Sequence, residues 1–357
     1  MKKKGLSIIV IGALMISMLG GCGTPKEVTE NVTLLELAAA NDYTSTTVAK
    51  TAERYANEND LLYKKRPVKS DGVEDIKAEV QAAIEAGTDV IVCSGTAFEV
   101  PIYQLQGQYK NTKFVIVDGA PKKEEGKKLT VRKNTEAIMY AEEQGGFLAG
   151  YAAVKDGYMN LGFIGGVPNE NVVRYGSGFV QGANYAAGEM GLDKDKIIVR
   201  FTYLGTNEMS PTLMEMAGQW YDDGVEIIFA SGGTIGTAVM KAAEQKDKKV
   251  IGVDCDQSSE SNSVVVSVVK QVDSSVYSTL TSVYNGEFRG KKAEEVNVAD
   301  GGIALSMEKA KFNSFTQQDY ATIVDKMGGK DLEIFNDEVK ILQDKKDSVA
   351  NITLTIE

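Results

Sequence analysis

The stretch DVIVCSGTAFEV, residues 89–100, and the stretch VEIIFASGGTIG, residues 225–236, share one pattern. In each, an apolar run rich in β-branched residues ends in Ser-Gly, and a helix-like segment follows. About 24 residues after the Ser-Gly, a second apolar run ends in an aspartate: KFVIVDGAP (113–121) contains Asp118 and KVIGVDCDQ (249–257) contains Asp254. Because the same unit occurs once in each half of the chain, the sequence predicts two similar lobes.

The rest of the chain alternates in the same way, which is typical of parallel sheets covered by helices. Strands are expected at 32–39, 89–93, 113–117, 159–164, 197–203, 225–229, 250–253 and 264–268, and helices at 47–57, 73–86, 142–154, 177–190, 211–222 and 236–245. A chain of 357 residues also exceeds the size of one hydrophobic core. We therefore predict an α/β fold with two doubly wound parallel-sheet lobes.

The lobes are expected to exchange segments. The N-terminal lobe is assigned residues 32–134 and 257–286, and the C-terminal lobe residues 135–256 and 287–357. Beyond residue 285 the sequence predicts a surface loop, a final strand and a polar helix over 315–345, with no recognisable chemistry.

The composition excludes several classes of function. The formal net charge is -11, with no long basic run beyond the N-terminus, so nucleic acid is not an expected partner. There is no histidine, which removes the usual general base and the commonest metal ligand. Three scattered cysteines do not form a zinc motif. We expect no metal, no cofactor and no catalytic residues.

The N-terminus has the features of a bacterial export signal. Lys2, Lys3 and Lys4 precede an apolar stretch, residues 6–19, that is too short to span a bilayer comfortably. It leads into Leu19-Gly20-Gly21-Cys22, which resembles the lipobox of lipoproteins. This resemblance implies a signal peptide over 1–21, lipidation of Cys22, a tether over 22–31, and a place on the outer face of the cell membrane. The alternative is an ordinary secretory signal with a chance cysteine.

Ligands of open parallel sheets bind beyond the carboxyl ends of the strands. Ser94, Gly95, Gly232 and the two aspartates all fall at such ends, so two facing lobes would enclose them in a cleft. Asp118 and Asp254 then form a pair of carboxylates on opposite sides of a gap. The alternative for each is a local role as the cap of the next helix or turn.

Five stretches resemble the basic membrane protein lipoproteins, relatives of the purine nucleoside receptor that serve as substrate-binding components of ABC importers. They are EEQGGFLAGYAA (142–153), LGFIGG with VVRYGSGFVQG (161–166 and 172–182), IIFASGGTIGTAV (227–239), VIGVDCDQ (250–257) and SVVKQVD (267–273). The resemblance implies a type I periplasmic-binding-protein fold, in which two lobes joined by hinge strands close on a small polar ligand. It also implies an ABC permease and ATPase as partners.

The resemblance assigns roles to particular residues. Asp254, in the V-D-x-D-Q motif, and Lys270, in the V-K-x-V-D motif, match the family's residues that hold ribose hydroxyls. The strand-end loop Gly232, Gly233 and Thr234 matches the backbone donors that line the family's cleft.

The sequence departs from the family where the nucleobase would be held. Asn41, Asp42 and Tyr43 stand where nucleoside-binding members begin an Asp-x-Ser-Phe-Asn motif, and Asn207 stands where a second aromatic is expected. Tyr43 or Phe98 could supply a replacement ring, although an aromatic at position 98 is more often a core residue than a stacking one. Arg174 and Tyr175 could reach the cleft or pin the hinge.

The leading hypothesis is a lipid-anchored binding protein for a small hydroxylated solute, with a nucleoside as the family's default ligand. An enzyme that uses paired carboxylates as acid and base is disfavoured. A sensor or surface adhesin with the same lobes is the remaining alternative.

Overall fold

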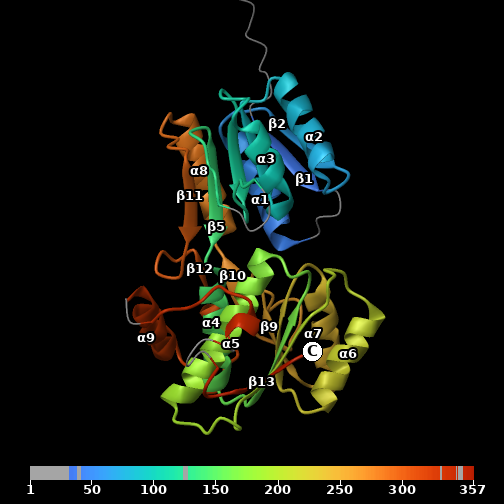
Figure 1. Cartoon of the computed structure of the whole chain (residues 1–357), viewed down its shortest axis with the longest axis vertical. Helices are drawn as coiled ribbons and strands as arrows, with labels where there is room; N and C mark the ends of the chain where they lie inside the picture. The colour runs from blue at the N-terminus through green and yellow to red at the C-terminus, as the bar shows by residue number, and fades with distance from the viewer. Residues whose placement is uncertain (1–31, 38–41, 124–127, 330–331, 343, 345–348) are drawn as a thin grey trace, which may run out of the picture.

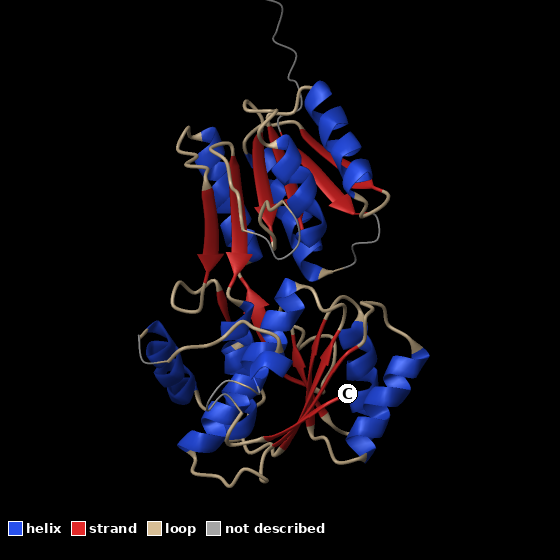
Figure 2. Cartoon of the chain, in the orientation of Figure 1, coloured by secondary structure: helices blue, strands red, loops and turns tan. Residues whose placement is uncertain are grey.

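The computed structural model consists of two α/β lobes, one above the other in Figures 1 and 2. It describes residues 32–37, 42–123, 128–329, 332–342, 344 and 349–357. Cys22 and Asn41, as well as the segments expected to be a signal peptide and tether, lie outside these residues. Two mainly parallel sheets, each with helices on both faces, confirm the predicted fold class.

The N-terminal lobe is a six-stranded parallel sheet in the order β11-β5-β4-β3-β1-β2. Its strands are β1 (Val32–Leu37), β2 (Tyr63–Val68), β3 (Val90–Ser94), β4 (Lys113–Val117), β5 (Thr135–Tyr140) and β11 (Lys292–Val296). The buried sides of α1 (Tyr43–Glu58) and α8 (Val272–Tyr284) share one core cluster with it. The other face packs against α2 (Val73–Glu85), the short 3-10 helix η1 (Thr96–Phe98) and α3 (Glu99–Leu105).

The C-terminal lobe is a seven-stranded sheet in the order β12-β10-β9-β8-β6-β7-β13, parallel except for the β10–β12 pair. Its strands are β6 (Asn160–Gly165), β7 (Ile198–Tyr203), β8 (Ile227–Ser231), β9 (Lys249–Gly252), β10 (Val264–Lys270), β12 (Ile303–Leu305) and β13 (Thr353–Ile356). One face packs on α4 (Glu142–Lys155) and α5 (Glu170–Glu189), the other on α6 (Pro211–Asp222) and α7 (Ile235–Lys246).

The chain crosses between the lobes three times, at the segments 140–142, 270–272 and 296–303. The predicted lobe boundaries are therefore wrong. They assigned β5 and β11 to the C-terminal lobe and β10 to the N-terminal lobe, whereas the sheets show the opposite. The reason is physical: a strand that ends at a hinge has the same apolar composition as its neighbours, so the sequence shows a strand without showing its sheet.

The C-terminal segment completes the lower lobe. It contains the 3-10 helix η2 (Met307–Lys309), α9 (Gln317–Gly328) and the single turn α10 (Val339–Leu342), so the single polar helix predicted over 315–345 is wrong. One carboxylate oxygen of Asp156 accepts the backbone N–H groups of Asn313, Ser314 and Phe315 at 2.6–3.0 Å and fixes this return to α4. Among the described helices, none combines the length and apolar character that crossing a bilayer requires.

Four glycines let α4 and α5 touch backbone to backbone. A Cβ on Gly146 would overlap the carbonyl of Tyr175, and one on Gly178 would overlap the carbonyl of Glu143. Gly150 and Gly182, one turn further along each helix, are equally close to the facing chain. This contact sets the first turn of α4 beside Arg174 and Tyr175 of α5, which places four polar side chains near the hinge.

We predict that Gly178→Ala lowers the free energy of unfolding by about 3 kcal/mol, the upper end for overpacking, because backbone atoms cannot move away from the new methyl group. The matched control is Gly218→Ala in α6, where a Cβ would meet only the tip of Lys246 at 3.6 Å. There the change should be neutral or stabilising by up to about 1 kcal/mol. Urea unfolding of both variants checks this, and equal effects would contradict the packing argument.

Candidate ligand-binding cleft

Lys270, the last residue of β10, places its ammonium group among three carboxylates. Its Nζ lies 2.9 Å from Asp118 Oδ2, 2.9 Å from Glu142 Oε1 and 3.6 Å from Asp254 Oδ1. Asp118 belongs to the N-terminal lobe, and the other two carboxylates belong to the C-terminal lobe. Only 2% of the Lys270 side chain is exposed. The cluster therefore joins the lobes where the chain crosses between them.

The two aspartates predicted as a pair have the same local geometry. Asp118 follows β4 with φ 56°, and Asp254 follows β9 with φ 64°, both in the left-handed region. Aspartate is among the few non-glycine residues that adopt this conformation readily. The backbone N–H of Lys270 donates to the carbonyl of Asp254 at 3.0 Å. The repeat seen in the sequence thus produces two equivalent strand ends that face one lysine.

Burial and charge act in opposite directions within this cluster. Burial raises the pKa of the Asp118 carboxyl, with Lys270 opposing the shift and Glu142 adding to it. Burial likewise raises the pKa of Asp254, again against Lys270. Burial alone would lower the pKa of Lys270, but Asp118 and Glu142 outweigh it and hold that pKa well above its usual range. The lysine is therefore charged, and the surrounding acids exceed it in number.

Tyrosines complete the lining of the cluster. The hydroxyl of Tyr175 donates to Asp254 Oδ1 at 3.1 Å. The rings of Tyr140 and Tyr175 lie 5.3 and 5.5 Å from the ammonium of Lys270, which favours its charged form. Asp118 Oδ1 is buried and accepts no hydrogen bond from a described residue. A buried carboxylate oxygen without a donor can still accept a hydrogen bond from an O–H or N–H group of a ligand.

Arg174 makes a second ion-pair cluster at the hinge. Its Nε lies 2.6 Å from Glu143 and 3.5 Å from Glu142, and its Nη2 lies 2.5 Å from Glu295 of β11 in the other lobe. The arginine is 4% exposed. Of the two roles considered for Arg174, pinning the hinge is the one for which the structure provides contacts.

The predicted strand-end loop of the C-terminal lobe is held by Asn207. Its side-chain oxygen accepts the N–H of Val167 at 2.9 Å, and its carbonyl accepts the N–H of Thr234 at 2.9 Å. Gly232, with φ 138°, leaves no room for a Cβ beside Gly166. Gly233 is also left-handed, with φ 51°. Asn207 therefore ties the loops after β6, β7 and β8 into one rim.

The N-terminal lobe supplies fewer of the predicted contacts. Gly95, with φ 103°, follows Ser94 at the end of β3, and its N–H donates to the carbonyl of Val117. Phe98 has no exposed surface and belongs to the core beneath α2 and α3. The prediction that its ring stacks on a ligand is therefore wrong, because the ring packs in the apolar core behind the strand ends.

Two other predicted residues, Asp42 and Tyr43, lie at the start of α1 and differ in their contacts. The carboxylate of Asp42 caps the helix, accepting both the N–H and the hydroxyl of Ser45 at 2.8 Å. Tyr43, the first helical residue, is 44% exposed. It lines a hollow of about 750 Å³ that also contains Asp254 and Lys270.

One side of the hollow beside Tyr43 is lined by residues that were not predicted from the sequence. Met307 and Tyr320, from the segment expected to carry no chemistry, line it beside Asp254. Glu142 of the lysine cluster was also missed as a site residue; its signal in the sequence was position alone, at the start of a helix. Tyr175, expected with Arg174 either to reach the cleft or to pin the hinge, contacts Asp254 of the cluster.

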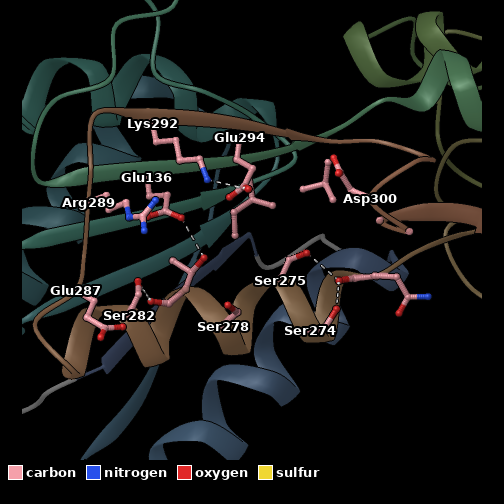
Figure 3. Close-up of a pocket in the computed structure, with 16 residues that line it drawn as sticks. Glu136, Ser274, Ser275, Ser278, Ser282, Glu287, Arg289, Lys292, Glu294 and Asp300 are labelled. Carbon is pink, nitrogen blue, oxygen red and sulfur yellow. Dashed lines mark hydrogen bonds and ion pairs between the residues drawn. The ribbon is translucent and has the colours of Figure 1, made fainter. Parts of the chain in front are cut away.

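A second hollow, of about 520 Å³, lies between α8 and the strands β5 and β11 (Figure 3). Serine and threonine hydroxyls of α8 face Glu136, Lys292 and Glu294 across it. Neither strand-end aspartate nor Lys270 lines this hollow. Within the described residues, no group of histidine, cysteine and acidic side chains has the arrangement of a metal site.

We predict that Lys270→Met lowers the free energy of unfolding by about 3–5 kcal/mol at neutral pH, because it leaves buried carboxylates without their cation. Without Lys270, the pKa values of Asp118 and Asp254 rise further. A carboxyl whose pKa is higher in the folded than in the unfolded protein adds stability at low pH, and this is lost as pH rises through the folded pKa. The variant should therefore lose stability more steeply than the parent between pH 5 and pH 8.

Urea unfolding across that pH range measures the effect. Lys309→Met is the matched control, because Lys309 pairs with Asp256 at the surface and should show little change at any pH. A loss for Lys270→Met that is the same at pH 5 and pH 8 would contradict the charge argument.

Comparison with known proteins identifies the family. A family model described as ABC transporter substrate-binding protein PnrA-like matches residues 32–345. Basic membrane protein D of Borreliella burgdorferi is 32% identical over 262 residues, which cover 72% of this chain and 71% of that protein. The ABC transporter nucleoside-binding protein BmpA of Lactococcus lactis is 25% identical over 343 residues, 87% of this chain and 93% of that protein.

Solved structures support the fold independently. A solute-binding protein of an ABC transporter system from Aeropyrum pernix superposes with a TM-score of 0.68 at 20% identity, covering 90% of this chain and 91% of that one. A second, from Conexibacter woesei, has a TM-score of 0.66 at 18% identity and covers 86% and 99%. Since the family model spans most of the residues and both lobes, the chain belongs to the PnrA-like family of ABC transporter substrate-binding proteins.

Proposed function

We propose that this protein is a lipid-anchored, extracytoplasmic receptor that binds a nucleoside between its lobes and delivers it to the permease and ATPase of an ABC importer. One observation carries the ligand proposal: a buried ammonium between carboxylates of facing lobes, with Asp118 Oδ1 left without a hydrogen-bond donor. The printed name of the Lactococcus lactis relative, a nucleoside-binding protein, supports the ligand class.

The cluster suits a vicinal diol. A carboxylate such as Asp254 accepts hydrogen bonds from two neighbouring hydroxyls, and the Lys270 ammonium donates hydrogen bonds to the same hydroxyl oxygens. Inside a closed cleft these bonds are stronger than in water, because the surroundings have a low effective dielectric constant. A ligand that lacks the hydroxyls would leave the acids unpaired, at a cost of about 1–3 kcal/mol for each group.

Closure requires contacts that form across the gap. Lys122, in the loop after β4, lies 2.9 Å from Glu99 of its own lobe and 3.1 Å from Glu170 at the start of α5. Asn171 donates to the carbonyl of Asp118 at 3.4 Å. A ligand that contacts both lobes shifts the population towards this closed arrangement, because an open cleft offers it only half of the bonds.

Tyr43 is the ring that we assign to the nucleobase. It is the exposed aromatic in the hollow on the N-terminal side, whereas Asn207 and Phe98 are committed to the loop rim and the core. Stacking on one aromatic ring is worth about 1–3 kcal/mol for a base. Because Tyr43 is the single ring assigned to the base here, we expect modest discrimination among bases.

The lipid anchor rests on the lipobox-like Leu19-Gly20-Gly21-Cys22. A diacylated or triacylated cysteine holds a protein at the membrane far more firmly than one chain would. The described fold begins at Val32, ten residues after Cys22, which leaves a short tether between the anchor and the receptor.

We predict that Asp254→Asn weakens binding of a ribonucleoside by tenfold or more, while the melting temperature of the ligand-free protein changes little. Calorimetric titration with adenosine, guanosine, cytidine and uridine identifies the best ligand, and its 2′,3′-dideoxy analogue tests the diol. The substitution should weaken binding of the dideoxy analogue much less, because that analogue lacks the 2′- and 3′-hydroxyls that would bond to Asp254.

Asp256→Asn is the matched control, since the Asp256 carboxylate is already held by Lys309 at 2.9 Å and by the N–H of Ser258 at 3.0 Å. It should bind within about twofold of the parent. If Asp254→Asn weakened binding of the ribonucleoside and its dideoxy analogue equally, or greatly lowered the melting temperature, the role of Asp254 would be purely structural.

A further inference from the structure

Three neighbouring loops at the outer edge of the N-terminal lobe are rich in basic residues. All six strands of this lobe point towards the hinge, so their starts lie at the edge farthest from the C-terminal lobe (Figure 2). The loops 106–112, 130–134 and 285–291 lead into the neighbouring strands β4, β5 and β11. With the first residues of β4 and β11, they contain seven basic residues and one acidic residue, Glu287.

Hydrogen bonds fix these loops side by side. The side chain of Asn134 donates to the carbonyls of Gln106, Tyr109 and Thr112 at 3.0–3.1 Å, which ties the first loop to the second. The N–H of Lys291 is shared by the carbonyls of Arg132 and Thr135, which ties the third loop to the second. The charges therefore form one surface held in a fixed arrangement.

We call this surface the basic edge and define it by five residues: Lys110, Lys113, Arg132, Lys133 and Lys291. Four of them are exposed, and Lys113 lies half-buried over the ring of Phe288. None of the five forms an ion pair with another described residue. The remaining two bases differ: Lys292 pairs with Glu294 at 2.8 Å, and Arg289 leans over the hollow of Figure 3 beside Glu136.

The basic edge contrasts with the rest of the molecule. The chain as a whole carries a net charge of -11. At the same end of the same lobe, the loops 57–62 and 85–89 lead towards β2 and β3 and carry four acids and no base. The outer end is thus divided into a basic half and an acidic half, so the basic half is not a consequence of general surface composition.

The tether enters at this same end. β1 begins at Val32, and β1 is four strand spacings from β11, which is about 19 Å. The ten residues 22–31 reach at most about 35 Å when fully extended. A lipid on Cys22 would therefore keep the basic edge within reach of the bilayer surface.

We propose that the basic edge docks on the anionic phospholipid headgroups of the membrane to which the protein is tethered. The proposal rests on the lipid anchor of the proposed function. Docking by one half of the outer end tilts the lobe, with β11 towards the bilayer and β2 away from it. The cleft, at the opposite end of the strands, then faces away from the membrane at a set angle.

The chemistry favours a charged surface over a single small anion. The five side chains come from three separate loops and the start of β4. Lysines and arginines near an anionic bilayer each gain attraction independently, by about fivefold in affinity. Such attraction is screened within about 8 Å at physiological ionic strength, so only residues at the membrane-facing edge contribute.

The test uses the chain from residue 22 onward with Cys22→Ser, so that no acyl chain contributes. It is sedimented with vesicles of phosphatidylglycerol and phosphatidylcholine in a 1:3 ratio, and with pure phosphatidylcholine, at low and physiological salt. The test variant is Lys110→Gln/Arg132→Gln/Lys133→Gln. The control is Lys194→Gln/Lys196→Gln/Lys241→Gln, which removes the same charge from exposed positions of the C-terminal lobe.

We expect the parent and the control to bind the anionic vesicles in a salt-dependent manner and the test variant to bind at least tenfold more weakly. Equal weakening in both triple variants, binding to neutral vesicles as strong as to anionic ones, or no binding by the parent would each overturn the proposal. Nucleoside titration of the same variants tests the receptor function, and acyl labelling of Cys22 in cells tests the lipid anchor. A failure of either can therefore be distinguished from a failure of membrane docking.

Discussion

The buried ammonium of Lys270 is the interaction on which the two-lobed arrangement depends. Removing such a charge from water is costly, and only close carboxylates compensate for it. Three carboxylates from both lobes surround it at 2.9–3.6 Å. In the proposed function, opening the cleft would expose or rearrange this cluster, and a ligand whose hydroxyls bind the spare carboxylate oxygens would stabilise the closed form. The proposal therefore assigns stability and ligand recognition to the same atoms.

The cluster in turn depends on packing that is remote from any ligand. Gly146 and Gly178 allow α4 and α5 to approach until their backbones touch, and this places Glu142 beside Lys270 and Tyr175 beside Asp254. The strand-end aspartates reach the same point because both adopt left-handed backbone conformations. The stretch EEQGGFLAGYAA, which resembles the family, is thus explained largely by helix packing. The glutamate at its start, Glu142, is the residue of this stretch that contacts Lys270.

The internal repeat allowed the strand-end residues to be predicted from the sequence, whereas features that depend on how the lobes are connected could not be. The repeat predicted Asp118 and Asp254 as partners across a gap, and the structure brings both to Lys270. Lys270 itself was identified through the family resemblance alone. The lobe assignment of β5, β10 and β11 could not be predicted, because a hinge strand has no distinctive composition. Phe98 was misplaced since an aromatic after a strand end can turn inwards as easily as outwards, and Glu142 was missed because an acid in a first helical turn is usually explained by the helix dipole.

A crystal structure of the protein with its best-binding ribonucleoside tests the central claim most directly. The account predicts a ligand enclosed between the lobes, with its 2′- and 3′-hydroxyls at hydrogen-bond distance, about 3 Å, from Asp254 and Lys270. A ribose that points into solvent, or a ligand that occupies the hollow beside α8 while the lysine cluster stays as it is, would contradict it.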